Sequence, residues 1–225
     1  KDGRIIGGEI LLRWHFEGED ISPAIFIPML EKENVIHIVS RWVFEQAVRS
    51  CVRMVTYIPN FCLAFNVSAY QLADEAFTDI MQKTLQKYRL QGKHLIAEMT
   101  ESCLDEQPET LTYFMDMCKK MGIQIALDDF GSGYSSLRML LRYPCDVIKI
   151  DRSLLLEVTK SEEKLQFIRS IVYACHQFGK MVCMEGVENE EQNTMIKNTG
   201  CDMIQGYHYY RPTELSTFYR LLSKM

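Results

Sequence analysis

The chain has 225 residues, of which 47% are hydrophobic and 24% charged, and its formal net charge is −5 at pH 7. These values are ordinary for a single globular domain, and the negative charge argues against a protein that coats DNA or RNA. No apolar run approaches the roughly 20 residues that a membrane span needs, and no signal-peptide pattern opens the chain. We therefore expect a cytoplasmic domain without membrane contact of its own. A membrane anchor of the full-length protein would lie in segments that this sequence lacks.

The first predicted strand covers residues 7–14, GGEILLRW. Its period-two pattern places Glu9, Leu11 and Arg13 on one face. The residues that follow, HFEGEDISPAIFIPML, contain two prolines, and we expect a loop there. Apolar residues at helical spacing then predict a helix over 40–55.

Strands and helices alternate along the rest of the chain. Further strands are predicted at 61–69, 94–102, 123–127, 146–151, 181–186 and 201–207. Helices are predicted at 70–90, 108–122, 161–180, 189–200 and 213–224. A loop with Gly131 and Gly133 and a short helical run separate the strands at 123–127 and 146–151, and Ser161 is expected to cap the helix that it begins.

Seven strands that are mostly followed by helices predict a largely parallel sheet, either a closed barrel or an open, doubly wound sheet. The chain has no G-x-G-x-x-G motif after its first strand and no Walker loop, so nucleotide binding by those routes is not supported. Polar residues near the ends of successive strands favour the barrel, because these ends meet at one mouth, where active sites of that fold lie. These residues are Asn66, Glu98, Asp128, Lys149, Glu185 and Gln205.

Five of the residues expected at this mouth are acids: Glu9, Glu98, Asp128, Asp129 and Glu185. Carboxylate-rich sites suit Mg²⁺ or Mn²⁺. Five acids exceed what one Mg²⁺ usually takes from protein, which favours two ions about 3.5–4 Å apart with a shared carboxylate, as in phosphoester hydrolysis. Lys149 can orient a water molecule or offset phosphoryl charge, and Arg13 suits a phosphate.

Plainer explanations exist for the same residues. Two aspartates before a glycine are typical of a turn. Arg13 and Lys149 are equally compatible with salt bridges to neighbouring acids. Eight cysteines without a C-x-x-C pair predict reduced core thiols, not a disulfide framework or a zinc site. The apolar stripes of 40–55 and 161–179 are more typical of core than of a dimer interface.

A series of motifs then identifies a known family. The motifs are Glu9-Ile10-Leu11 with Leu12-Arg13-Trp14, SPAIFIP (22–28), NVS (66–68), EMTE (98–101), DDFGSGYSSL (128–137), KID (149–151), EGVE (185–188), and QGY (205–207) with Arg211-Pro212. They cover almost the whole chain, in an order that resembles the EAL domain, the cyclic di-GMP-specific phosphodiesterase of bacterial signalling. The resemblance implies a TIM-like (β/α)8 barrel and hydrolysis of one phosphodiester of cyclic di-GMP to linear pGpG.

The resemblance also implies roles for individual residues. The implied ligands of two Mg²⁺ or Mn²⁺ ions are Glu9, Asn66, Glu98, Asp128, Asp129 and Glu185, with Asp128 as the bridge. Lys149 resembles the residue that orients the hydrolytic water, Gln205 assists it, and Glu9 and Glu185 are counted with them as catalytic.

Substrate contacts are implied for Arg13, Asp151 and Glu188. The loop after Asp129 resembles one that couples dimerisation to metal binding in the family, and Glu101 resembles its anchor. We therefore expect a homodimer. Fused or associated sensory or GGDEF-type domains would fit a chain excised from a larger signalling protein.

Three departures from the family pattern stand out. Ile10 replaces the alanine of the signature, and we expect a change of packing with little loss of chemistry. The loop after Trp14 lacks the usual His-Pro step. The family's first strand, upstream of residue 7, is missing, so we expect a single, N-terminally truncated barrel domain over 1–225 with seven strands.

Three functions remain in competition: an active cyclic di-GMP phosphodiesterase, an EAL-like receptor that binds the dinucleotide without cutting it, and a barrel hydrolase for another phosphodiester. Degenerate receptors usually lose metal ligands or the loop after the paired aspartates, whereas this chain keeps each of those residues. The sequence therefore favours the enzyme.

Overall fold

The computed structural model describes residues 3–72, 74, 76–100, 108–132, 137–158 and 161–224. The chain divides into two compact units. The Ile5–Glu98 unit also includes the helix at 108–121 and the C-terminal helix, and the Gln124–Thr213 unit includes the end of the preceding strand. Each unit is described separately below.

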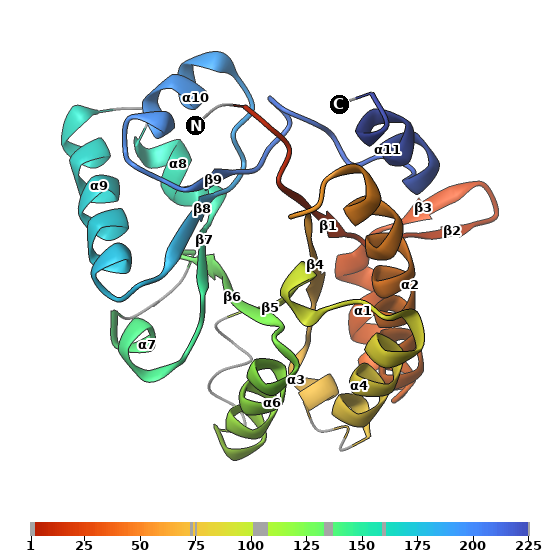
Figure 1. The fold of residues 1–225 in the computed structure, drawn as a ribbon. Coiled ribbons are helices and arrows are strands. Elements are labelled where there is room, and N and C mark those ends of the chain that lie inside the picture. Colours follow the sequence, from red (N-terminus) through yellow and green to blue (C-terminus); the bar gives the residue numbers. More distant parts are fainter. Residues whose placement is uncertain are drawn as a thin grey trace. The chain divides into compact units, whose positions relative to one another are not determined.

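The Ile5–Glu98 unit contains a parallel run of strands, a short hairpin and most of the helices (Figure 1). Its strands are β1 (Gly7–Ile10), β2 (Trp14–Phe16), β3 (Glu19–Ile21), β4 (Cys62–Asn66) and β5 (Leu95–Thr100). Its helices are α1 (Pro23–Lys32), α2 (Ile36–Tyr57), α3 (Ala69–Leu72), α4 (Phe77–Tyr88), η1 (Gly92–His94), α6 (Pro108–Met121) and α11 (Leu215–Leu222). β4 pairs in parallel with β1 and with β5.

Aromatic side chains form much of the core of this unit. Phe44 of α2 contacts Phe65 of β4 and Phe77 of α4, with ring centroids 5.1 and 6.1 Å apart. Phe77 in turn stacks on Phe114 of α6, and all four rings are buried. Edge-to-face and stacked pairs of this kind add to the hydrophobic stabilisation of a core. They fix α2, α4 and α6 around β4, which carries one of the predicted site residues at its end.

Residues 11–32 differ from the sequence prediction. The predicted strand over 7–14 ends at Ile10, and a β2–β3 hairpin follows where a loop was expected. Glu17 and Gly18 form its two-residue turn with φ of 50° and 87°, which suits a hairpin because such turns match the twist of the flanking strands. The segment expected to be a loop also contains α1. Pro23 is compatible with this helix because it lies in the first turn, where a backbone N–H would have no partner within the helix.

The Gln124–Thr213 unit alternates strands and helices throughout (Figure 1). Its strands are β6 (Gln124–Phe130), β7 (Val147–Ile150), β8 (Met181–Met184) and β9 (Met203–Ile204). Its helices are α7 (Leu137–Arg142), α8 (Arg152–Val158), α9 (Glu162–Gln177) and α10 (Glu190–Lys197). The strands pair in parallel in the order β6-β7-β8-β9, and α9 packs against β8. Ser161 caps α9 as predicted, by accepting a hydrogen bond from the backbone of Lys164.

Within the described residues, the parallel strands form one order, β1-β4-β5-β6-β7-β8-β9, and every strand predicted from the sequence corresponds to one of them. The helix predicted over 70–90 is divided into α3 and α4. The α/β fold with a parallel, seven-stranded sheet is therefore confirmed. The organisation as one truncated domain over 1–225 stays a prediction.

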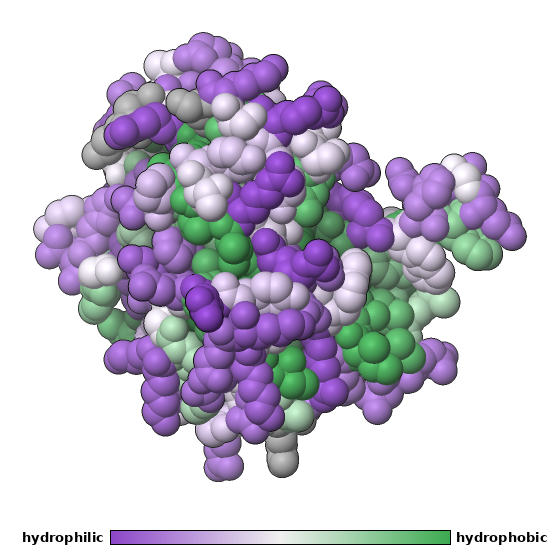
Figure 2. Space-filling view, turned by 45° about the vertical axis from the view of Figure 1, so that its right-hand side comes forward, coloured by the Kyte–Doolittle hydropathy of each residue, from purple (hydrophilic) through white to green (hydrophobic). Residues whose placement is uncertain are grey.

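The cysteines and the surface agree with the composition. All seven cysteines in the described part of the chain are free, and all but Cys62 are buried. Burial raises the pKa of the Cys51 and Cys118 thiols to about 12. Much of the face in Figure 2 is hydrophilic, with hydrophobic residues gathered in smaller groups. No helix among the described residues is both long and apolar enough to span a membrane.

Candidate functional site

The end of β6 carries a bulge that determines where its two aspartates point. Leu127 pairs with Ile148 of β7 and Phe130 pairs with Ile150, so Asp128 and Asp129 together face one residue of β7. Asp129 has a φ of 55°, a left-handed conformation that aspartate tolerates better than most residues. Neighbouring residues of a regular strand point to opposite faces. A bulge changes that pattern and re-aims side chains, so both carboxylates can serve one site.

The β7 residue opposite the bulge is Lys149. Its side chain is almost fully buried, and its Nζ lies 3.1 Å from Oδ1 of Asp128 and 2.8 Å from Oε1 of Glu185. Glu185 follows directly after β8, where its backbone N–H donates to the carbonyl of Ile150 and continues the parallel ladder. Because parallel strands end at the same edge of a sheet, three successive strands deliver these side chains to one place.

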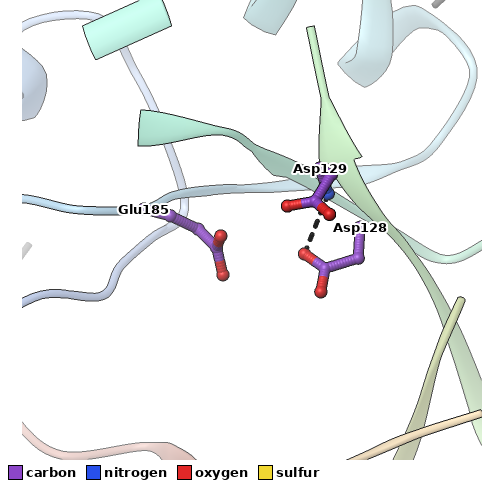
Figure 3. Close-up of side chains that lie close together, drawn as sticks. All are labelled: Asp128, Asp129 and Glu185. Carbon is purple, nitrogen blue, oxygen red and sulfur yellow. Dashed lines mark hydrogen bonds between the residues drawn. The ribbon is translucent and has the colours of Figure 1, made fainter. Parts of the chain in front are cut away.

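Asp128, Asp129 and Glu185 form an acid cluster whose carboxylate oxygens lie within 4.8 Å of one another. Figure 3 shows the three side chains, with Glu185 reaching toward the two aspartates from another segment. The backbone N–H of Asp129 donates to Oδ1 of Asp128 at 3.0 Å, which fixes that carboxylate. Among the described residues, these three form the one group of at least three His, Cys, Asp or Glu side chains close enough together to hold a metal ion.

The other predicted residues of this unit lie in the segments that follow β7, β8 and β9. Gln205 follows β9, and its N–H donates to the carbonyl of Met184. Oδ1 of Asp151 accepts a hydrogen bond from the N–H of Ser153 at the start of α8. Glu188 pairs with a residue that the sequence analysis did not single out, Arg152. The substrate roles of Asp151 and Glu188 stay predictions.

Three predicted metal ligands belong to the Ile5–Glu98 unit, where they form a group of their own. Asn66, at the end of β4, donates from Nδ2 to Oε1 of Glu9 on β1 at 2.7 Å. Asn66 is also in register with Glu98 of β5, whose side chain is buried. The structure therefore brings Glu9, Asn66 and Glu98 to neighbouring strands, and their metal role stays a prediction.

The predicted strand position of Arg13 is wrong, and its role as a substrate contact stays a prediction. Arg13 was expected on the strand face of Glu9, but β1 ends at Ile10 and Arg13 lies in the exposed segment before the hairpin. Its Nη1 donates to the carbonyl of its neighbour Leu12. The chain leaves the sheet earlier than the alternation suggested because it turns into β2. Glu101 and Gly133 lie outside the described residues.

Sequence reasoning missed two features of the site. The bulge at Asp128 and Asp129 had a signal in the sequence, because aspartate tolerates the left-handed backbone that one residue of a bulge can adopt. The ion pair of Arg152 with Glu188 had none, because it joins residues 36 positions apart in sequence whose proximity depends on the fold.

Comparison with known proteins places these observations in a family. The model of the EAL domain matches residues 1–212. The chain is 33% identical over 216 residues to MucR of Pseudomonas aeruginosa, a bifunctional diguanylate cyclase/cyclic di-GMP phosphodiesterase, covering 94% of this chain and 31% of MucR. It is 31% identical over 219 residues to the cyclic di-GMP phosphodiesterase PdeR of Escherichia coli, covering 97% of this chain and 33% of PdeR.

A solved structure agrees with these matches. The structure of the PaMucR phosphodiesterase in complex with c-di-GMP superposes with a TM-score of 0.84 and 32% identity, covering 95% of this chain and 87% of that one. The chain spans about a third of the length of the two curated relatives. The family model covers residues 1–212, and the two curated relatives match nearly all of this chain. The chain therefore belongs to the EAL domain family.

Proposed function

We propose that this chain hydrolyses cyclic di-GMP to linear pGpG, using Mg²⁺ or Mn²⁺ held at the acid cluster. The observation that carries the proposal is the cluster of Asp128, Asp129 and Glu185 with Lys149 among them. The names of MucR and PdeR, both cyclic di-GMP phosphodiesterases, support the choice of substrate.

The acid cluster fits a divalent cation. Its donors are carboxylate oxygens from three positions, the ligand type that Mg²⁺ and Mn²⁺ prefer. Asp128 and Glu185 share the ammonium group of Lys149, and a divalent ion would offset the mutual repulsion of the three carboxylates. A bound ion would supply Lewis-acid polarisation of the phosphoryl group and a lower pKa for bound water. A second ion, and the participation of Glu9, Asn66 and Glu98, belong to the proposal.

Within this proposal, the protein's own residues divide the remaining work. Asp128 and Glu185 hold Lys149 from two strand ends, so that its ammonium group has a fixed direction. Lys149 orients the attacking water and faces the charge that develops on the phosphoryl oxygens, as a preorganised donor in a dry site does. Gln205 lies at the end of the neighbouring β9 and assists in positioning the water. A homodimer and fused signalling domains are also part of the proposal.

The test is incubation with cyclic di-GMP in Mg²⁺ or Mn²⁺, followed by chromatography of the products. We expect linear pGpG in either metal and none in EDTA. Tight binding of cyclic di-GMP without any product would contradict the enzyme and support the receptor. Hydrolysis of a generic phosphodiester such as bis(p-nitrophenyl) phosphate, with cyclic di-GMP left intact, would indicate a different hydrolase.

A further inference from the structure

The loop that joins β8 to α10, residues 185–189, carries Glu185 of the acid cluster and is held on two sides by backbone hydrogen bonds. The N–H of Glu185 donates to Ile150 of β7, and the N–H of Val187 donates to Gln205 after β9. Val187 is fully buried. These contacts fix the backbone at 185 and 187, and the N–H of Glu188 donates to Oε1 of Gln192 at 2.7 Å. The position of Gly186 and the side chain of Glu188 remain to be fixed.

Arg152, the first residue of α8, contacts both of the remaining positions. Its Nη2 lies 3.0 Å from Oε1 of Glu188. Its stem covers Gly186, since a Cβ built on this glycine would lie only 2.6 Å from Cβ and Cγ of Arg152. Gly186 has a φ of 71°, in the region that glycine adopts without strain. One arginine therefore contacts the loop immediately after Glu185 and again two residues later.

The position of this contact is more informative than its strength. The side chains of Arg152 and Glu188 are 52% and 39% exposed, and ion pairs with such exposure contribute little to global stability. The contact of Arg152 with Gly186 lies one residue from Glu185 of the acid cluster, and Arg152 itself lies three residues after Lys149 along the chain. A contact that adds little to the fold can still restrict the direction of a neighbouring ligand, as outer partners of metal ligands do.

We propose that Arg152 is a positioning residue for Glu185. By covering Gly186 and holding Glu188, it keeps the β8–α10 loop in the conformation that directs the Glu185 carboxylate at Lys149 and at the ion of the acid cluster. Glu188 then serves as the anchor of this contact, a role different from the substrate contact predicted from the sequence. The inference rests on the proposed function, because it concerns the ion of the same cluster.

The primary test is a titration of Mn²⁺ into the metal-free protein. The electron paramagnetic resonance signal of free Mn²⁺ measures how much of the metal remains unbound. We expect Arg152→Ala to weaken Mn²⁺ affinity by about tenfold, the lower end of the effect of removing an outer partner of a metal ligand. Arg152→Met keeps the stem over Gly186 without the ion pair and should fall between Arg152→Ala and wild type. Arg152→Lys keeps both the stem and a charge for Glu188 and should restore most of the affinity.

Arg169→Ala is the matched control. Arg169 of α9 forms an ion pair with Glu162 at the same 3.0 Å in the same unit, and neither residue belongs to the acid cluster. It should leave Mn²⁺ affinity unchanged, and circular dichroism should show native folding of both alanine variants. In kinetics with cyclic di-GMP at fixed Mn²⁺ below saturation, Arg152→Ala should lower kcat with little change in KM.

Two outcomes would overturn the inference. Unchanged Mn²⁺ affinity with a raised KM in Arg152→Ala would make Arg152 a direct substrate contact. An equal loss of Mn²⁺ affinity in Arg169→Ala would show that the loss follows from removing any positive charge, and not from the position of Arg152. Failure of the proposed function is separable, because a wild-type protein that binds Mn²⁺ and leaves cyclic di-GMP intact would refute the reaction while the titration still tests Arg152.

Discussion

Two lysine–carboxylate contacts of nearly the same length differ in how deeply their side chains are buried. Lys149 lies 2.8 Å from Glu185, with side-chain exposures of 4% and 17%. Lys87 lies 2.7 Å from Glu45, with exposures of 62% and 38%. Water and salt screen the exposed pair, whereas the buried lysine has lost its hydration and depends on its protein partners. Distance alone therefore does not tell which contact matters.

The two lysines also differ in the protein groups that they contact. Lys87 of α4 also contacts the ring of Tyr88 and remains free to be hydrated. Lys149 contacts both Asp128 and Glu185, each delivered by a different strand. Buried ion pairs seldom stabilise a protein more than apolar residues of the same size would. A charged group kept at such a position is therefore better explained by chemistry than by folding.

The largest expected effect comes from breaking the buried contact. Lys149→Met removes the ammonium group and keeps an apolar stem of similar length, so turnover of cyclic di-GMP should fall by about three orders of magnitude, as expected when a positioned donor is lost. Lys180→Met is the matched control, because Lys180 is buried in the same unit but donates to the carbonyls of Tyr143 and Cys145. Initial rates of pGpG release measure both. Comparable activity of Lys149→Met and wild type would mean that the site is misassigned.

A second prediction concerns the stability that metal adds. Mn²⁺ at one hundred times its dissociation constant should raise the free energy of unfolding by about 2.7 kcal/mol, because it binds only the folded state. Asp128→Asn should lose most of this increment in urea denaturation with and without Mn²⁺.

The control for this measurement is Asp202→Asn, since Asp202 contacts His176 and the backbone of Val182, outside the acid cluster. It should lower stability in both conditions and keep the increment. An undiminished increment in Asp128→Asn would place the ion elsewhere.

The smallest effect is expected at the exposed pair. Hydrogen bonds from Lys87 and Tyr88 lower the pKa of Glu45 below its ordinary value of 4.5, and the bond to Glu45 raises the pKa of Lys87 above 10.5. The contribution of Glu45 is therefore present above pH 4.5 and lost as pH falls through its lowered pKa. The contribution of Lys87 is present below pH 10.5 and lost as pH rises through its raised pKa.

Lys87→Met should leave the melting temperature at pH 7 within about a degree of wild type, because the pair is screened. In Lys87→Met, the melting temperature should also depend slightly less on pH at acidic and alkaline pH. Thermal melts between pH 3 and pH 11 would measure this. A shift at pH 7 as large as that of Asp202→Asn would contradict the comparison between the exposed and the buried pair.

The sequence predicted most of the sheet because burial imposes a pattern on each strand separately. The seven parallel strands and the cap at Ser161 depend on local alternation and local hydrogen bonds. The proximity of Asp128, Lys149 and Glu185 was predicted for a related reason, since parallel strands end at one edge. Each of these predictions needs only short-range information.

The errors arose where longer-range or conformational information was needed. The prolines near residue 23 suggested a loop, although the first of them lies in the first turn of α1, where proline is favoured. Arg13 was misplaced because the end of β1 depends on the hairpin that follows. Arg152 was missed because its partner, Glu188, lies beyond α8, α9 and β8 in the chain.

The left-handed backbone at Asp129 has a consequence for anyone who dissects the site by mutation. Alanine at this position removes the carboxylate and also disfavours the backbone of the bulge, so an alanine scan would confuse the loss of a charge with the straightening of the strand. Asparagine tolerates the same backbone and keeps the shape of the side chain without its charge. Comparing Asp129→Asn with Asp129→Ala therefore separates the contribution of the charge from that of the bend.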